Sequence, residues 1–336
     1  MADLTTTWLG LTLKTPLVVA ASPLSNDVEA IASAVSAGAG AVIMYSLFEE
    51  QLVAEQMAAH RFLDARTDLD AEARTFLPDV DVFSLGAEPY LAQLGRLRKR
   101  VDVPIIASLN GTTPGGWTNY AQKLEAGGAS AIELNLYEVV TSPAESGELV
   151  EQRQLAVVAA VAGAVRIPVT VKLTPFYASV PAFLRRLELA GARGVALFNR
   201  FYQPDIDLEE LDVDTKLVLS TARELPLRLH ALAIVSPDTP LSLACTGGAH
   251  SGHDVAKAIV CGADVVQLAS VLLERGPAYL GVIREQLVRW LDDKQYASSD
   301  EARGVLARNS APDRHAWERL HYMRLLDGWR PRNSAR

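Results

Sequence analysis

Short apolar runs alternate with longer amphipathic segments along most of the chain. The runs are continuously apolar, a pattern typical of parallel strands that are buried on both faces. Each run is followed by a segment with helical spacing, and glycines end several of these segments. The repetition predicts a (β/α)8 TIM barrel. The predicted strands are Leu17–Ala20, Ala41–Met44, Val103–Leu109, Ala131–Leu136, Pro168–Leu173, Gly194–Phe198, Leu241–Cys245 and Val265–Leu268.

Segments outside the repeat predict additions to the barrel. An N-terminal hairpin is expected around Lys14-Thr15-Pro16, an irregular insertion at Tyr202–Leu211, and a two-helix tail at Ser298–Trp329. A long helix is expected at Phe48–Asp64, and a polar helix or loop at Thr67–Leu77. The remaining helices are predicted at Asp27–Ala37, Pro89–Arg100, Gly116–Ala126, Gly147–Val165, Ser179–Ala190, Asp214–Glu224, Leu227–Val235, Ser251–Cys261 and Pro277–Leu291. Because no Ser/Gly/Pro-rich linker divides the chain, we expect one domain over residues 1–336, with 298–336 as a helical extension.

The amino-acid composition favours one soluble α/β barrel and argues against nucleic-acid-binding and iron–sulfur proteins. The 336 residues are 49% hydrophobic and 21% charged, which suits one α/β barrel. The formal charge of −8, without a basic patch rich in aromatics, argues against nucleic acid as a partner. No leader pattern and no apolar run of about 20 residues is present, so we expect a soluble, cytoplasmic protein. Cys245 and Cys261 are the only cysteines, too few for a four-thiolate iron–sulfur cluster, and no metal site is predicted.

Two small-residue turns lie close together near the end of the predicted barrel. Thr246-Gly247-Gly248 follows the seventh strand, and Ala269-Ser270 follows the eighth. Glycine lets an anion approach backbone N–H groups closely, and the loops after strands seven and eight of such barrels often hold a phosphate. The turns therefore predict a phosphate site, with an ordinary structural turn as the alternative.

Polar residues at the other strand ends should converge on one mouth of the barrel. Lys172 ends an otherwise apolar strand, so its ammonium needs an anionic or polar partner, either a ligand or a core glutamate such as Glu133. Three carboxamides at one mouth favour a planar ligand rich in hydrogen-bonding groups, such as a flavin, although any one of them could instead satisfy loop backbone. The polar strand-end residues are Ser22, Tyr45, Ser46, Asn110, Asn135, Lys172, Asn199 and Thr246.

With these features assembled, the chain resembles the dihydroorotate dehydrogenase family of FMN barrels. The resemblance runs from Leu9 to about Leu291 and depends on the order and spacing of several motifs. They are LKTPLVVAASPLS, VIMYSLFEEQ, IASLNGT, AIELNLY, VTVKLTP, LFNRFYQPDID, CTGGAHSGHD and CGADVVQLAS.

The resemblance implies an FMN site and, in addition, a homodimer. Lys172 would face the N1/O2 edge of the flavin, where a fixed cation favours the negative charge of the reduced ring. Asn199 would line the substrate side. The residues implied to bind the cofactor are Ala20, Ala21, Ser22, Tyr45, Asn110, Asn135, Lys172, Asn199, Thr246, Gly247, Gly248, Ala269 and Ser270.

The part of the implied site that would hold the substrate departs from the family pattern. Where the family usually ends its second strand with lysine, this chain has Tyr45. In an ungapped register, Glu138 takes the position of the family's cysteine or serine base and Val140 that of an asparagine in the same loop, whereas a one-residue gap would move Tyr137 or Thr141 into the base position. Glu138 and Tyr137 are therefore the candidate catalytic bases beside Lys172, and a solvated loop carboxylate is the alternative role for Glu138.

Three functions follow from these observations. The first is an FMN oxidoreductase that acts on a carbon–carbon bond beside a carbonyl, with hydride transfer to flavin N5. The second is a flavin-binding redox subunit without dihydroorotate activity, which would need a redox protein partner because it lacks cluster cysteines. The third is a flavin-free barrel that binds another phosphorylated metabolite.

Overall fold

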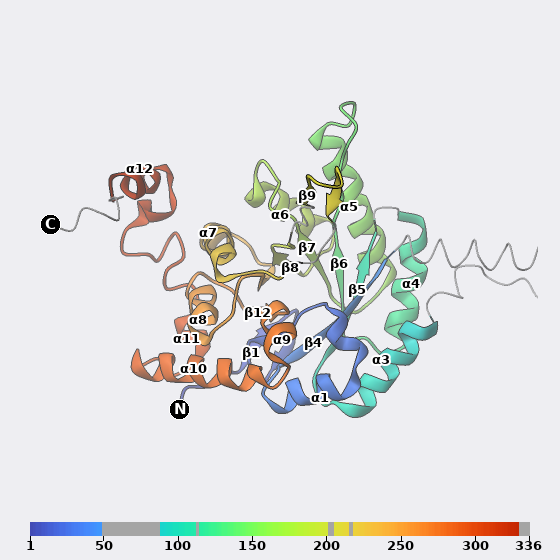
Figure 1. Ribbon diagram of the computed structural model, residues 1–336, viewed down its shortest axis with the longest axis horizontal. Coiled ribbons are helices and arrows are strands. Elements are labelled where there is room, and N and C mark those ends of the chain that lie inside the picture. Colours follow the sequence, from blue (N-terminus) through green and yellow to red (C-terminus); the bar gives the residue numbers. More distant parts are fainter. Residues whose placement is uncertain (49–87, 112–113, 201–204, 215–217, 329–336) are drawn as a thin grey trace, which may run out of the picture.

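Eight parallel strands close into a barrel in the order β11-β12-β3-β4-β5-β6-β7-β8 (Figure 1). The computed structural model describes residues 1–48, 88–111, 114–200, 205–214 and 218–328. The predicted TIM barrel is confirmed, and each predicted strand overlaps an observed one. The strands are β3 Leu17–Val19, β4 Ala41–Phe48, β5 Ile105–Asn110, β6 Ala131–Asn135, β7 Val169–Leu173, β8 Gly194–Leu197, β11 Ser242–Thr246 and β12 Val265–Leu268.

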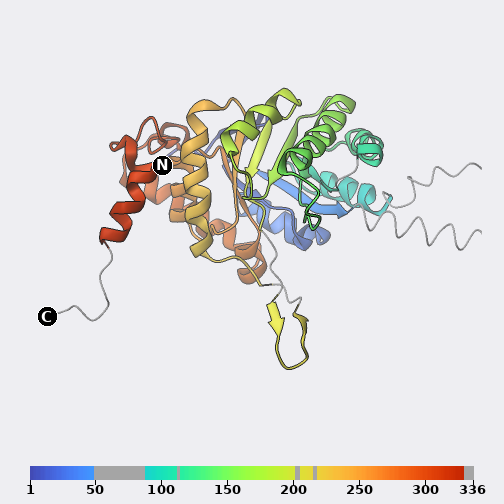
Figure 2. The same ribbon diagram turned by 90° about the horizontal axis from the view of Figure 1, so that it is seen from above.

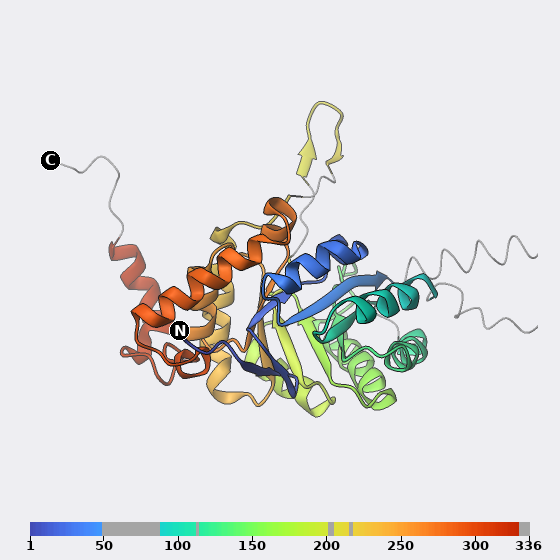
Figure 3. The same cartoon turned by 90° about the horizontal axis from the view of Figure 1, so that it is seen from below.

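Helices surround the strands on the outside of the barrel (Figures 1 and 3). Several begin at serine caps, whose hydroxyl oxygens accept a hydrogen bond from a free backbone N–H of the first turn: Ser146 before α5, Ser179 before α6 and Ser251 before α8. The α-helices are α1 Val28–Ser36, α3 Glu88–Arg100, α4 Pro114–Ala126, α5 Gly147–Ala164, α6 Val180–Leu189, α7 Leu225–Val235, α8 Gly252–Val260, α9 Ser270–Arg275, α10 Tyr279–Asp293, α11 Ser299–Ala302 and α12 Arg319–Gly328. The 3-10 helices are η1 Pro23–Asn26, η4 Ala222–Glu224, η5 Ser236–Asp238 and η6 Arg314–Trp317.

The N-terminal hairpin closes one end of the barrel. Its strands, β1 (Thr6–Trp8) and β2 (Leu11–Leu13), pair antiparallel around Leu9 and Gly10, whose φ angles are 55° and 75°. Two positive φ values are the signature of a tight type I′ hairpin, so the turn lies here and not at Lys14-Thr15-Pro16. The fully buried Trp8 packs with Leu9 and Leu13 against inward-facing strand residues. The opposite end, formed by the carboxyl ends of the strands, remains for the functional site.

The segment after β8 differs from the prediction. The expected helix Asp214–Glu224 is wrong: Asp214 ends β10, and among the described residues helix begins only with η4 at Ala222. The segment predicted as an irregular insertion, Tyr202–Leu211, contains β9 (Asp205–Asp207), which pairs with β10 (Asp212–Asp214) in a hairpin. Alternating acidic and apolar residues, with Ile206 opposite Val213, explain the strands. The hairpin stands away from the barrel (Figures 2 and 3).

The remaining predictions concern the ends and insertions. The expected two-helix tail is present as α11 and α12, separated by η6, up to Gly328. The helix expected at Phe48–Asp64 and the segment Thr67–Leu77 lie almost wholly outside the described residues. Among the helices described, none is both long and apolar enough to cross a membrane. The single-domain boundary over residues 1–336 stays a prediction.

Candidate active site

Two adjoining cavities open at the carboxyl ends of the barrel strands. We call them the Gly247 cavity, with an empty volume of about 770 Å³, and the Asn135 cavity, with about 1150 Å³; both volumes include space open to solvent. The residues that line both cavities are Ala21, Ser22, Pro23, Lys172 and Asn199. Because these residues are shared, the cavities form one continuous depression with Lys172 at its junction.

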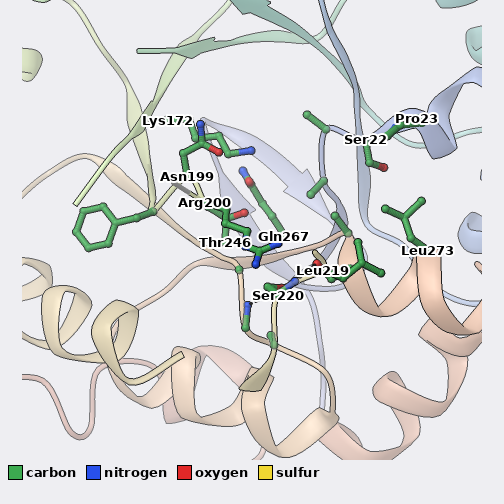
Figure 4. A pocket seen from close by; sticks show the side chains of 18 residues that line it. Ser22, Pro23, Lys172, Asn199, Arg200, Leu219, Ser220, Thr246, Gln267 and Leu273 are labelled. Atoms are coloured by element: carbon green, nitrogen blue, oxygen red, sulfur yellow. Dashed lines mark hydrogen bonds between the residues drawn. The ribbon is translucent and has the colours of Figure 1, made fainter. Parts of the chain in front are cut away.

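The Gly247 cavity is lined by residues at the carboxyl ends of β3, β7, β8, β11 and β12. Figure 4 shows Lys172 beside Asn199, with Ser22 and Pro23 on the opposite side. Among the described residues, the cavity lining contains cations but no carboxylate, which suits an anionic ligand. The lining residues are Ala20, Ala21, Ser22, Pro23, Lys172, Phe198, Asn199, Arg200, Leu219, Ser220, Thr246, Gly247, Gly248, Ala249, Gln267, Ala269, Ser270 and Leu273.

The two predicted small-residue turns meet in this cavity. Gly247 and Gly248 have φ angles of +87° and +85°, a conformation that favours glycine. The Gly248 N–H donates to Ser220 Oγ at 3.4 Å, and Ser220 Oγ in turn donates to Ser270 Oγ at 2.8 Å. Hydroxyl groups therefore connect the turn after β11 with the turn after β12.

A buried arginine supports the glycine turn from behind. Arg228 of α7 donates from Nε to the Thr246 carbonyl oxygen at 3.1 Å and from Nη1 to the Glu224 carbonyl oxygen at 2.9 Å. Burial lowers the pKa of Arg228, and the nearby Glu224 carboxylate opposes that effect. Arg200, which lines the cavity, also lies near Glu224, with Nε 3.7 Å from Oε1.

Lys172 lies beside the core glutamate that the sequence offered as its partner, and it also borders both cavities, so its role toward a ligand stays a prediction. Its Nζ lies 3.7 Å from Glu133 Oε1, and its side chain still borders both cavities with 10% of its surface exposed. Gln267 of β12 donates from Nε2 to Glu133 Oε2 at 2.9 Å. Three strands of the barrel thus contribute one buried polar array beneath the mouth.

Strand register brings the other predicted residues into the Asn135 cavity. Asn110, Asn135 and Lys172 are direct neighbours across β5, β6 and β7, so their side chains share one layer. Asn199 Nδ2 donates to Asn135 Oδ1 at 2.9 Å. The cavity is lined by Ala21, Ser22, Pro23, Asn26, Tyr45, Ser46, Phe48, Asn110, Asn135, Tyr137, Lys172 and Asn199.

Local contacts fix the second strand end. The Tyr45 N–H donates to Ser25 Oγ at 2.7 Å, and the Tyr45 ring meets the edge of Tyr90, with centroids 4.9 Å apart. Ser46 Oγ hydrogen-bonds Ser108 Oγ at 2.8 Å. The tyrosine that stands where the family has lysine is therefore built into the cavity wall.

The two candidate bases are separated by the fold. Tyr137 lines the Asn135 cavity, whereas Glu138 lines neither cavity. Glu138 forms an ion pair with Arg153 of α5, which also contacts Glu145 at 2.8 Å. Hydrogen bonds from Glu145 and Glu138 raise the pKa of Arg153, because they favour its charged form. The side chain of Glu138 is only 15% exposed, so it is a paired residue and not a solvated one.

All thirteen residues predicted to bind the cofactor line one or both cavities. Sequence reasoning did not assign Arg200, Ser220 or Gln267 to the site. Arg200 directly follows Asn199 and could have been proposed from that position. Ser220 comes after the β9–β10 hairpin and carries no local signal. No group of three metal-ligating side chains is found among the residues that the structure describes.

Comparison with known proteins identifies one family that matches most of the chain. The family model for dihydroorotate dehydrogenase matches residues 3–291. A protein of Aeropyrum pernix named putative dihydroorotate dehydrogenase A (fumarate) is 31% identical over 223 residues, or 64% of this chain and 71% of that one. The catalytic subunit of dihydroorotate dehydrogenase B (NAD(+)) of Thermoplasma acidophilum is 25% identical over 320 residues, or 92% of this chain and 100% of that one. The chain therefore belongs to the dihydroorotate dehydrogenase family of oxidoreductases.

Proposed function

We propose that the protein is an FMN-dependent oxidoreductase that acts on a carbon–carbon bond next to a carbonyl group. The observation that carries the proposal is the pair of adjoining cavities with Lys172 at their junction. One cavity suits a phosphate and its chain, and the other has carboxamides suited to a planar ring and a substrate beside it.

Unpartnered polar groups in the cavity walls support FMN as the cofactor. Ser22 Oγ and Gln267 Oε1 are buried without a hydrogen-bond partner, and both residues line the Gly247 cavity. Buried polar groups ordinarily have partners, so these atoms favour a polar ligand. The Gly247-Gly248 turn, Ser220 and Ser270 would hold the phosphate, and Lys172 would face the ring.

When bound, FMN would supply the hydride acceptor. The chain's own residues would bind the cofactor and orient the substrate beside it. Lys172 would hold positive charge near the edge of the ring that becomes negative on reduction, and the linked Asn199 and Asn135 would orient polar ligand atoms. Tyr137 is the better-placed candidate to accept the substrate proton, because Glu138 is engaged with Arg153.

The first experiment is identification of the bound cofactor. We expect the purified protein to be yellow and to release FMN on denaturation, with one FMN for each chain measured by absorbance and chromatography. A protein that stays colourless after incubation with excess FMN would contradict the proposal and favour a different phosphorylated ligand.

A second prediction tests the glycine turn. A Cβ at Gly248 would lie 2.6 Å from the backbone nitrogen of Leu225, and its φ is unfavourable for other residues. We expect Gly248→Ala to weaken FMN binding at least ten-fold, or about 1.4 kcal/mol. It should also lower stability, because the start of α7 must shift.

The matched control is Gly10→Ala. Gly10 also has a positive φ, of +75°, but a Cβ there meets nothing within 4 Å. It therefore reproduces the backbone strain without the clash and away from the cavities. Equal FMN affinity of Gly248→Ala and Gly10→Ala, measured by fluorescence titration, would show that the phosphate lies elsewhere.

A redox subunit is the second candidate function. Relatives such as that of Thermoplasma acidophilum are named as catalytic subunits, which favours a protein partner. Turnover of small donors by the isolated chain, with a soluble acceptor, separates an autonomous enzyme from such a subunit. A homodimer and a cytoplasmic location complete the proposal, and sedimentation tests the dimer.

A further inference from the structure

A buried carboxylate beneath the cavities has no role in the proposed function so far. Glu133 of β6 is 0% exposed, and its Oε1 has no hydrogen-bond partner. Its charged neighbour is Lys172, with 3.7 Å between Oε1 and Nζ, and Gln267 holds its other oxygen at 2.9 Å.

Such a pair is not explained by stability alone. Burying two charges costs hydration, and apolar residues of similar volume usually stabilise a core at least as well. Glu133 is two residues before Asn135, which shares its layer with Lys172. Side chains two residues apart lie on one face of a strand, so Glu133 lies one layer deeper in the barrel than Lys172. The ammonium therefore stands between the carboxylate and the cavities.

We propose that Glu133 is a positioning residue for Lys172. Its carboxylate, fixed by Gln267, holds the ammonium at the cavity floor and moderates the positive charge that a bound ligand meets. This inference rests on the proposed function, since the ligand in question is the flavin ring. Because interaction energy falls with distance, the nearer ammonium dominates at the ring and the deeper carboxylate reduces its effect.

The first test compares Glu133→Gln with Thr170→Val. The glutamine keeps shape and the hydrogen bond to Gln267 but removes the negative charge. We expect the equilibrium constant for two-electron reduction of bound FMN to rise at least ten-fold, which corresponds to about 30 mV in midpoint potential. The binding of sulfite, an anion that adds to flavins, should tighten in parallel.

Thr170→Val is the matched control, because Thr170 pairs with Glu133 in register and is buried, with an unpartnered Oγ1. It changes a polar core residue without changing charge, and we expect the parental potential. A Glu133→Gln potential equal to or below that of Thr170→Val would overturn the proposal.

The second test needs no flavin. In the ligand-free protein, Lys172→Met leaves the Glu133 carboxylate buried and uncompensated. We expect the double variant Lys172→Met/Glu133→Gln to unfold at a higher temperature than Lys172→Met alone. Additive effects of the two substitutions on the melting temperature would overturn the pairing. If the chain binds no FMN yet the two effects are strongly coupled, the proposed function fails while the positioning of Lys172 by Glu133 stands.

Discussion

Replacing Lys172 with methionine is expected to weaken FMN binding and to make the bound flavin harder to reduce, each by at least ten-fold in the equilibrium constant. Its ammonium is the one charge that borders both cavities among the described residues. Without it, negative charge on the reduced ring loses its nearest cation, and a ten-fold loss corresponds to about 1.4 kcal/mol. Fluorescence titration measures the affinity for FMN, and potentiometry measures the midpoint potential of the bound flavin.

Lys257→Met is the control for this prediction. Lys257 is an exposed residue of α8 whose Nζ lies 3.3 Å from Asp254 Oδ1, and it borders neither cavity. The substitution removes the same charge outside both cavities, so the affinity for FMN and the equilibrium constant for its reduction should each stay within about two-fold of the parent, because a surface ion pair contributes little. Unchanged affinity and potential in Lys172→Met would assign that lysine a purely structural role.

The barrel could be predicted from sequence because its signal is local. Continuous apolar runs mark strands that are buried on both faces, and Val265–Leu268 was predicted with its observed limits. The position of the candidate site could be predicted because the carboxyl ends of the strands in such a barrel converge on one mouth. For this reason the sequence could predict that residues as distant as Ser22 and Ser270 lie at one site, and both line the Gly247 cavity.

The polar array could not be predicted because it depends on register between strands. Lys172, Glu133 and Gln267 lie on β7, β6 and β12, and their contacts require the stagger of the closed barrel. The sequence indicated Glu133 as an alternative partner of Lys172 but could not show that the lysine also borders the cavities. The ion pair between Glu138 and Arg153 could not be predicted for a similar reason, because it depends on how the loop after β6 packs against α5.

The hairpin after β8 was predicted only as an irregular insertion, and the helix that follows was predicted from Asp214, whereas the described part of the chain has helix only from Ala222. The stretch between Asp205 and Asp214 alternates in polarity, yet it is short and strongly acidic. A better signal was the pair Thr221 and Glu224, in which the Thr221 N–H donates to Glu224 Oε1 at 3.2 Å. Such a pair marks the start of a helix and not its interior, so helix belongs after Thr221.

Family membership alone is not a sufficient guide to the substrate of this protein. We expect dihydroorotate to be turned over at least ~10⁴-fold more slowly than the ordinary enzyme scale of ~10 s⁻¹. Among the described residues, the lining of the Asn135 cavity contains no cysteine and no carboxylate, and Lys172 is its one cation. An anionic substrate in this cavity would therefore find one cation to bind it and neither a thiol nor a carboxylate to accept its proton.

Two features of the cavity wall explain why we expect such slow turnover of dihydroorotate. Tyr45, at the position where the family has lysine, packs on Tyr90 and carries no positive charge at neutral pH. Glu138, which an ungapped register would place at the family's base position, is paired with Arg153 and lines neither cavity, so the phenol of Tyr137 is the candidate base that remains. A site that lacks the hydrogen-bonding and charged partners of a polar substrate discriminates strongly against it.

A steady-state assay with dihydroorotate and a broad electron acceptor decides the matter. Reduction of the bound flavin by dithionite, followed by reoxidation by the same acceptor, is the control that shows the loaded protein to be redox-competent. Turnover near 10 s⁻¹ would mean that the loop after β6 does supply a base and that our assignment there is wrong. Tyr137→Phe would then test the phenol directly, because it keeps the ring in the cavity wall and removes only the hydroxyl.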